Sequence, residues 1–139
     1  FAFRKRRCLM FWLHNTEQDM NWYDILKGDT REQLEANWRE QAKVKGTSKE
    51  LDYEPVCKLF IPWASGTWLL TELEPGTSLA FGLCDLGFGS PELGDVCLRE
   101  LFDYEGPGGL RLEQDIHFKA KMTLRQYADH ARRIGCVVI

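Results

Sequence analysis

The sequence predicts an α+β fold, in which a small antiparallel sheet of four to five strands, arranged as a meander, is packed by an N-terminal and a C-terminal helix. Two segments, residues 29–46 and 123–135, have the apolar spacing of helices. Between them, from residue 56 onward, apolar residues recur with a period of two, which is typical of half-buried strands. Because short turns rather than long crossovers separate these runs, neighbouring strands are predicted to pair antiparallel.

The first helix has a recognisable start and one apolar face. Asp29 or Thr30 is placed to cap its N-terminus. Leu34, Trp38 and Ala42 follow at intervals of four residues, so they lie on one side of the helix. This stripe is predicted to dock on the sheet.

The remaining elements follow from the same patterns. Four runs are predicted as strands, at residues 56–63, 66–74, 78–87 and 92–98. A short helix is predicted at residues 98–104, and a fifth strand at residues 115–119, "DIHFK". The closing helix is predicted to begin after Thr123 and to end at Gly135.

The turn "EPGT", residues 74–77, joins the second and third predicted strands. Its central Pro-Gly pair is the preference of a type II turn. A two-residue loop at this point pairs Leu70 with Phe81. In that register Glu72 lies roughly 20 Å from Asp85, at about 3.3 Å per residue, which is too far for the paired carboxylates of a glycosidase.

Length and composition indicate one domain. The chain has 139 residues, of which 44% are hydrophobic, and residues 20–139 are predicted to form a single globular domain. Residues 1–19 are predicted to be a peripheral or non-native N-terminal extension. No apolar run approaches the roughly 20 residues that cross a bilayer, and the five scattered cysteines favour reduced thiols. We therefore expect a cytoplasmic protein with no membrane partner.

Charge is distributed unevenly along the chain. Residues 71–106 carry eight acidic side chains against one basic side chain, Arg99, whereas residues 107–139 carry six basic against three acidic. An excess of one sign steers partners of the opposite sign, so the acidic region is predicted to face a protein with a basic surface. The alternative is an ordinary solvated surface. The acidic excess makes direct nucleic-acid binding an unfavoured interpretation.

Acidic residues around the loop at residues 86–91 are candidate binding residues. Asp85 and Glu92 flank this loop, and Asp95 follows on the next strand. Three carboxylates around one loop suit a hard cation such as Mg²⁺ or Ca²⁺. The spacing matches no known calcium loop, so a solvated acidic rim is the favoured interpretation, and no metal or cofactor is expected.

Asp115 and His117 form a second candidate pair. Two residues apart in the predicted fifth strand, they lie on one face of it, and a histidine beside a carboxylate is a possible general base. A structural histidine is the favoured alternative. The sequence contains neither a G-x-S-x-G nor an H-E-x-x-H motif, so no catalytic residue is assigned.

Four motifs occur in a specific order: "TWLLTEL", "FGLCDLG", "PELG" and "DIHF". Over about residues 20–135 the chain resembles a bacterial family known as domain of unknown function 2958, whose members are small cytoplasmic proteins of plasmids and other mobile genetic elements. The resemblance implies one folded unit and that genomic context, and it carries no catalytic residues. Two positions depart from the family pattern, because Trp38 stands where a small residue is common and Asp95 where an aromatic one is common.

These observations lead to one hypothesis and two alternatives. The leading hypothesis is a non-catalytic protein-interaction module with an acidic surface. The first alternative is a metal-assisted hydrolase that uses Asp85 and Glu92, with Asp115 and His117 as acid/base support. The second is a nucleic-acid-binding accessory protein that uses the basic C-terminal third.

Overall fold

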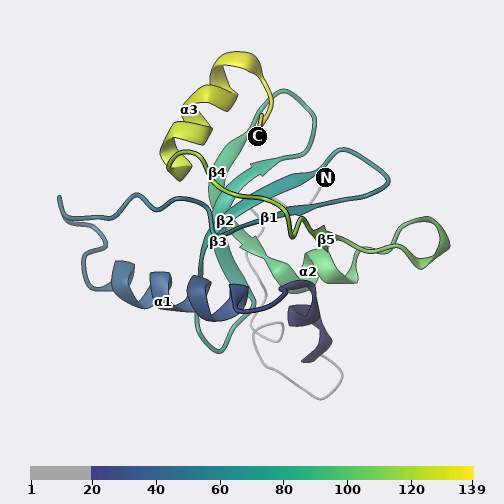
Figure 1. Cartoon of the computed structure of the whole chain (residues 1–139), viewed down its shortest axis with the longest axis horizontal. Helices are drawn as coiled ribbons and strands as arrows, with labels where there is room; N and C mark the ends of the chain where they lie inside the picture. Colours follow the sequence, from purple (N-terminus) through teal and green to yellow (C-terminus); the bar gives the residue numbers. More distant parts are fainter. Residues whose placement is uncertain (1–19) are drawn as a thin grey trace.

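The computed structural model describes residues 20–139 and confirms the predicted α+β class (Figure 1). The strands are β1 (Cys57–Phe60), β2 (Thr67–Leu73), β3 (Leu79–Asp85), β4 (Glu92–Cys97) and β5 (Glu113–Gln114). They form one antiparallel sheet in the order β4-β3-β2-β1-β5. The first four strands are therefore the predicted meander, and β5 adds to its β1 edge.

Helices precede, interrupt and follow the strands. They are the 3₁₀ helix η2 (Met20–Ile25), α1 (Thr30–Ala42), α2 (Leu98–Asp103), the 3₁₀ turn η3 (Pro107–Gly109) and α3 (Leu124–Ile134). α3 begins and ends as predicted: Thr123 and Gln126 form a capping box, and Gly135 ends the helix in the left-handed conformation. Within residues 20–139, every helix is too short or too polar to span a bilayer.

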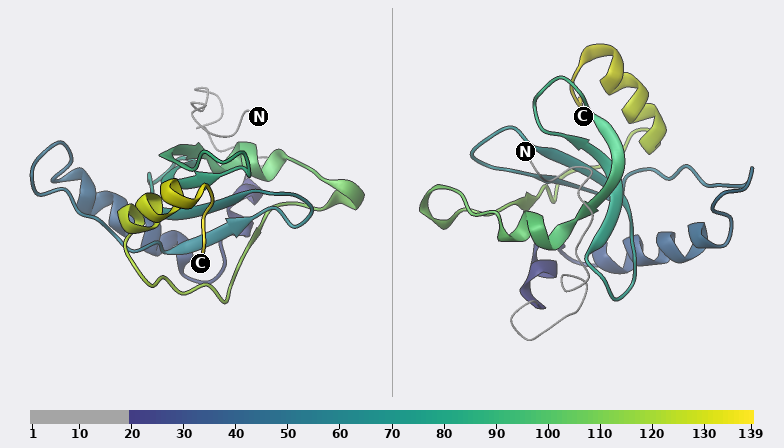
Figure 2. Two further views of the ribbon diagram at one scale, coloured as in Figure 1. Left: turned by 90° about the horizontal axis from the view of Figure 1, so that it is seen from above. Right: turned by 180° about the vertical axis from the view of Figure 1, so that it is seen from behind.

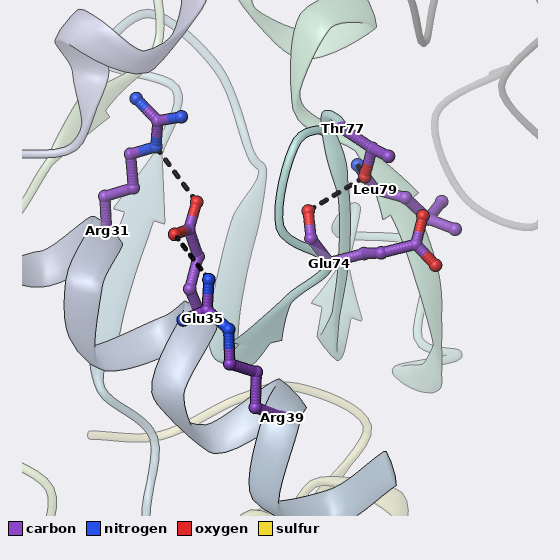
Figure 3. Close-up of polar contacts among 6 residues, drawn as sticks. All are labelled: Arg31, Glu35, Arg39, Glu74, Thr77 and Leu79. Carbon is purple, nitrogen blue, oxygen red and sulfur yellow. Dashed lines mark hydrogen bonds and ion pairs between the residues drawn. The ribbon is translucent and has the colours of Figure 1, made fainter.

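The apolar stripe of α1 differs in part from the prediction. Leu34 is fully buried, Trp38 is half-buried and Ala42 is exposed. Gln41 is buried in place of Ala42 because its side chain bonds a neighbouring backbone segment. Along α1, the Glu35 carboxylate forms ion pairs with Arg31 and Arg39 at 3.1 and 3.9 Å (Figure 3).

Two apolar cores cover the two faces of the sheet. The first lies under η2, α1 and α2 and contains Trp22, Trp68 and Leu98. The second lies under α3 and contains Leu83 and Tyr127. Figure 2 shows the strands lying between α2 and α3. The central strands β2 and β3 therefore bury side chains on both faces, which explains their nearly continuous apolar sequences.

The turn between β2 and β3 has the predicted conformation but sits in a longer loop. Gly76 has a φ of +76°, and the Thr77 N–H donates to the Glu74 carbonyl, as a type II turn requires. The Thr77 hydroxyl donates to the same carbonyl at 3.0 Å (Figure 3). The Glu74 N–H donates to the Leu79 carbonyl at 2.9 Å, so the loop between the paired ends holds four residues. A type II turn twists against the flanking strands in a two-residue hairpin, and the extra residues relieve this mismatch.

The longer loop makes the predicted register wrong. Leu70 pairs with Gly82, one residue away from its predicted partner Phe81, and Trp68 pairs with Cys84. Trp68 and Leu70 nevertheless face the first core.

A β-bulge at Thr71 shifts the register again. Leu70 faces the first core, and strict alternation would turn Glu72 into the same core. The bulge instead gives that core position to Leu73, which is 0% exposed, and pairs Glu72 with Phe81 on the other face. The bulge therefore keeps a carboxylate out of the apolar core.

The predicted fifth strand at residues 115–119 is wrong. β5 lies just before it, where Gln114 pairs with Leu59. Asp115 starts a turn instead, because its carboxylate accepts the His117 N–H and its carbonyl accepts the Phe118 N–H. The predicted extension at residues 1–19 lies outside the described residues, so the proposed domain boundary stays a prediction.

Candidate functional site

Two adjoining cavities open between α3, the last turns of α1 and the sheet. Their volumes are about 420 and 150 Å³. We call the two together the Glu72 cleft, because they share four lining residues: Gln41, Lys45, Glu72 and Phe81. The backbone that follows α1 returns to the sheet along this cleft (Figure 1).

One row of side chains crosses the floor of the cleft. Glu72 on β2, Phe81 on β3 and Asp95 on β4 are successive register partners. Directly opposed side chains share a face of the sheet and stand roughly 5 Å apart at Cβ. The Phe81 ring therefore lies between two carboxylates, of which Glu72 is 8% exposed and Asp95 is exposed.

Glu72 has an unusual environment for a glutamate. Its Oε2 accepts a hydrogen bond from the Thr71 hydroxyl at 3.3 Å, the one hydrogen bond to this carboxylate within the described part of the chain. Burial raises the pKa of Glu72; the Thr71 hydroxyl and Lys45 partly oppose this, whereas Asp95 adds to it. Glu72 therefore keeps its proton to a higher pH than an exposed glutamate does.

An irregular segment, residues 50–53, closes one side of the cleft, and we call it the strap. The Gln41 side chain both donates to the Leu51 carbonyl, at 2.7 Å, and accepts from the Leu51 N–H, at 2.9 Å. The Tyr53 carbonyl accepts the Leu124 N–H at 2.8 Å. The strap thus ties α1 to the first turn of α3 and fixes the width of the cleft.

Charged groups surround the apolar floor of the cleft. The acidic lining residues are Glu50, Asp52, Glu72, Glu74, Asp95 and Asp129, and the basic ones are Lys45, Arg125 and Arg132. Six carboxylates face three cations, and Arg132 is already paired with Asp129 at 2.8 Å. The cleft is therefore amphipathic and carries an acidic excess.

All residues that line the cleft lie within the part of the chain that matches a known protein family. Residues 25–138 match the family described as Protein of unknown function (DUF2958). The chain belongs to DUF2958. No curated protein and no solved structure matches it. In this DUF2958 chain Trp38 and Asp95 line the same 150 Å³ cavity.

Asp85, a predicted site residue of this DUF2958 chain, is part of the scaffold. It is 8% exposed, and its two oxygens accept the backbone N–H groups of Gly87 and Val137, each at 2.8 Å. The carboxylate thus joins the β3–β4 loop to the segment after α3. Both oxygens are engaged, so Asp85 does not belong to an acidic rim.

Glu92 lies on the opposite face of the sheet. It is the register partner of Cys84, which belongs to the first core, whereas Asp85 bonds Val137, which packs against the second core. Side chains alternate along a strand, so Asp85 and Glu92 do not converge. Within residues 20–139, no three histidine, cysteine or acidic side chains gather closely enough to hold a metal ion.

Asp115 and His117 meet through the backbone. The Asp115 carboxylate accepts the His117 backbone N–H at 3.0 Å and pairs with the Lys58 ammonium at 3.6 Å. The His117 side chain is exposed. This arrangement stabilises a turn and does not orient the imidazole as a general base.

Glu72 is the site residue that the sequence reasoning missed. The predicted register placed Glu72 too far from Asp85 for a pair of catalytic carboxylates, and Glu72 was not predicted to be a site residue. A signal was present: Glu72 is the one charged residue in the apolar strand "TWLLTEL". A charge in such a strand requires either a bulge or a cavity on its face.

Proposed function

We propose that this DUF2958 protein is a non-catalytic interaction module that binds a basic segment of a partner protein in the Glu72 cleft. The observation that carries the proposal is the acidic excess around an apolar floor, six carboxylates against three cations. Charge complementarity of this kind selects partners by sign and accelerates their association. The apolar floor, which includes Phe81 and Leu93, gives a bound segment somewhere to bury its own apolar side chains.

The geometry of the other candidate residues supports this choice. A metal-assisted hydrolase built on Asp85 and Glu92 needs the two carboxylates on one side of the sheet, and they lie on opposite faces. A nucleic-acid site on α3 needs available cations. Arg132 is paired with Asp129, and Arg125 lines a cleft whose other charges are mostly acidic.

The proposal also covers the partner, the cell compartment and the genomic origin of the protein. The partner we propose is a protein with a basic surface in the bacterial cytoplasm, and the protein itself would be encoded on a plasmid or another mobile genetic element. The support is the resemblance to DUF2958, together with the acidic excess of the cleft.

Two matched peptides test the proposed function. Acetylated, amidated Lys-Leu-Lys-Phe and Glu-Leu-Glu-Phe differ in charge but not in apolar content. In ¹H–¹⁵N spectra of the full chain, the basic peptide is expected to shift the amide signals of Glu72, Phe81 and Leu93, and the shifts should weaken with added salt. Equal effects of both peptides, or shifts confined to residues outside the cleft, would contradict the proposal.

A further inference from the structure

We propose that the smaller cavity of the Glu72 cleft receives a single ammonium group, the end of a lysine side chain on the partner protein. This inference rests on the proposed function and names the group that the cleft recognises. Four residues carry it: Trp38, Glu72, Phe81 and Asp95, all of which line this cavity.

The size of the cavity fits one side chain. Its volume is about 150 Å³, and a protein cavity of that volume accommodates a benzene-sized group. Pockets for drug-sized ligands are larger, roughly 300–1,000 Å³. The cavity opens beside the larger one, so the rest of a bound segment can lie in the wider part of the cleft.

The walls offer the two kinds of group that bind an ammonium. Trp38 and Phe81 are aromatic, and a cation within about 6 Å of a ring centroid is attracted to its face. Glu72 and Asp95 flank Phe81 across the sheet and supply carboxylates on either side of it. The cavity lining therefore contains both aromatic rings and carboxylates.

Two separate carboxylates without a third metal-binding side chain in the described part of the chain suit an ammonium better than a metal ion. Glu72 and Asp95 stand on strands that are two steps apart in the sheet, or roughly 10 Å between backbones. Metal ions need oxygen ligands within about 2.0–2.6 Å, and no metal-binding group of three side chains occurs within residues 20–139. A guanidinium prefers both oxygens of one carboxylate, whereas the three donors of an ammonium rotate freely toward separate acceptors.

The Glu72 carboxylate is itself incompletely satisfied. The side chain is more than nine-tenths buried, and Thr71 is its single hydrogen-bond donor within residues 20–139, acting on Oε2. Oε1 has no donor within residues 20–139 and is accessible from the cleft rather than sealed from it, so it leaves an acceptor position for a ligand. An acidic patch alone would not provide such a position.

Lys45 indicates that the site tolerates an ammonium nearby. It lines both cavities, and its positive charge acts on the Glu72 carboxyl. Lys45 extends from the exposed segment that follows α1. It therefore competes with a lysine from a partner, and its removal should strengthen binding.

Three probes that differ in one side chain test the inference. They are acetyl-Gly-Lys-Leu-amide and its counterparts with norleucine or arginine in place of lysine. The full chain is titrated with each probe, and the amide signals of Glu72 and Asp95 and the indole N–H signal of Trp38 are followed by NMR. The lysine probe should shift these signals saturably, the arginine probe more weakly, and the norleucine probe not at all.

Three substitutions complete the test, and thermal melting confirms that each variant is folded. Glu72→Gln is expected to lower the affinity for the lysine probe about tenfold, and Asp95→Asn about threefold. Lys45→Gln should raise the affinity by about twofold or more. Equal binding of the lysine and norleucine probes, or affinities that these substitutions leave unchanged, would overturn the inference.

The two proposals fail in different ways. If Lys-Leu-Lys-Phe shifts the signals of the larger cavity while the lysine probe leaves Trp38 and Asp95 unmoved, the ammonium receptor is wrong and the interaction module stands. If neither basic peptide shifts any signal of the cleft, both proposals are wrong.

Discussion

The side-chain amide of Asn37 donates a hydrogen bond to the carbonyl of Thr71 at 3.0 Å, which links α1 to the bulge of β2. A bulged residue lacks a regular ladder partner, and Thr71 is 1% exposed. Asn37 therefore supplies a donor to backbone that the sheet leaves incompletely paired. Because the bulge turns Glu72 toward the cleft, this contact between distant segments also helps to shape the candidate site.

The first prediction concerns this contact. Asn37→Ala should lower the free energy of unfolding by about 1–2 kcal/mol, because it leaves the Thr71 carbonyl without its side-chain donor. Urea denaturation measures the change. Gln33→Ala is the control on the same helix, since the Gln33 side chain donates to the exposed Asp29 side chain, and it should change stability by less than about 0.5 kcal/mol. Equal effects of the two substitutions would contradict a special role for Asn37.

The second prediction compares two glycines that are register partners. A Cβ on Gly82 would lie 2.0 Å from the Leu69 carbonyl oxygen, whereas a Cβ on Gly94 would meet nothing within 4 Å. Gly82→Ala is expected to cost about 1–3 kcal/mol or to prevent folding, because backbone on the neighbouring strand must move. Gly94→Ala should be near neutral. Thermal melts of both variants check the difference, and similar melting temperatures would show the β2–β3 packing to be wrong.

The third prediction concerns the clamp between Asp85 and the segment after α3. Asp85→Asn keeps the shape but replaces one acceptor with an NH₂ group, which then faces a backbone N–H of Gly87 or Val137. Stability should fall by about 1–3 kcal/mol. The free energy of unfolding of Asp95→Asn, a substitution at an exposed position, should lie within about 0.5 kcal/mol of the wild-type value. If chemical denaturation ranks Asp95→Asn as the more harmful substitution, Asp85 has no clamping role.

The fourth prediction concerns the pH dependence of stability that arises from Glu72. Burial is the main cause that raises its folded pKa above the unfolded value of about 4.3. Between these two pKa values the folded state binds more protons than the unfolded state, so this group makes stability fall as pH rises. Below the unfolded pKa, Glu72 is protonated in both states, so its carboxyl no longer destabilises the folded state.

Glu72→Gln tests that sign. Its stability relative to wild type should be greater at pH 8 than at pH 4, as measured by urea midpoints at both pH values. Glu54→Gln, at an exposed position, controls for the loss of one negative charge. A relative stability of Glu72→Gln that is constant with pH, or larger at pH 4, would contradict the proposed environment of Glu72.

The fifth prediction concerns thiol reactivity. Burial raises the pKa of Cys57 to about 12, and Cys57 is 1% exposed, whereas Cys136 is exposed. Because the thiolate is the reactive form, iodoacetamide at pH 8 should alkylate Cys136 and leave Cys57 unmodified. Peptide mass spectrometry of the native protein checks this, with urea-denatured protein as the control in which both react. Rapid modification of Cys57 in the native state would show that β1 is not buried as described.

The parts of the fold that the sequence determined depend on interactions between near neighbours. The α3 helix begins at a capping box between Thr123 and Gln126 and ends at Gly135, and all of these contacts span four residues or fewer. The turn at Pro75–Gly76 likewise takes its conformation from two adjacent residues. The antiparallel order of the strands follows from such short connections, so it was predictable as well.

The tertiary structure decided the register, the bulge and hence the candidate site. The Thr71 bulge is supported by Asn37, which lies 34 residues earlier, and by the close passage of the Leu69 carbonyl over Gly82 on the next strand. The side-chain period of a strand is two, so one extra residue exchanges the faces of everything beyond it. Whether Glu72 lies in the core or in the cleft therefore depends on contacts between segments that meet only when the chain has folded.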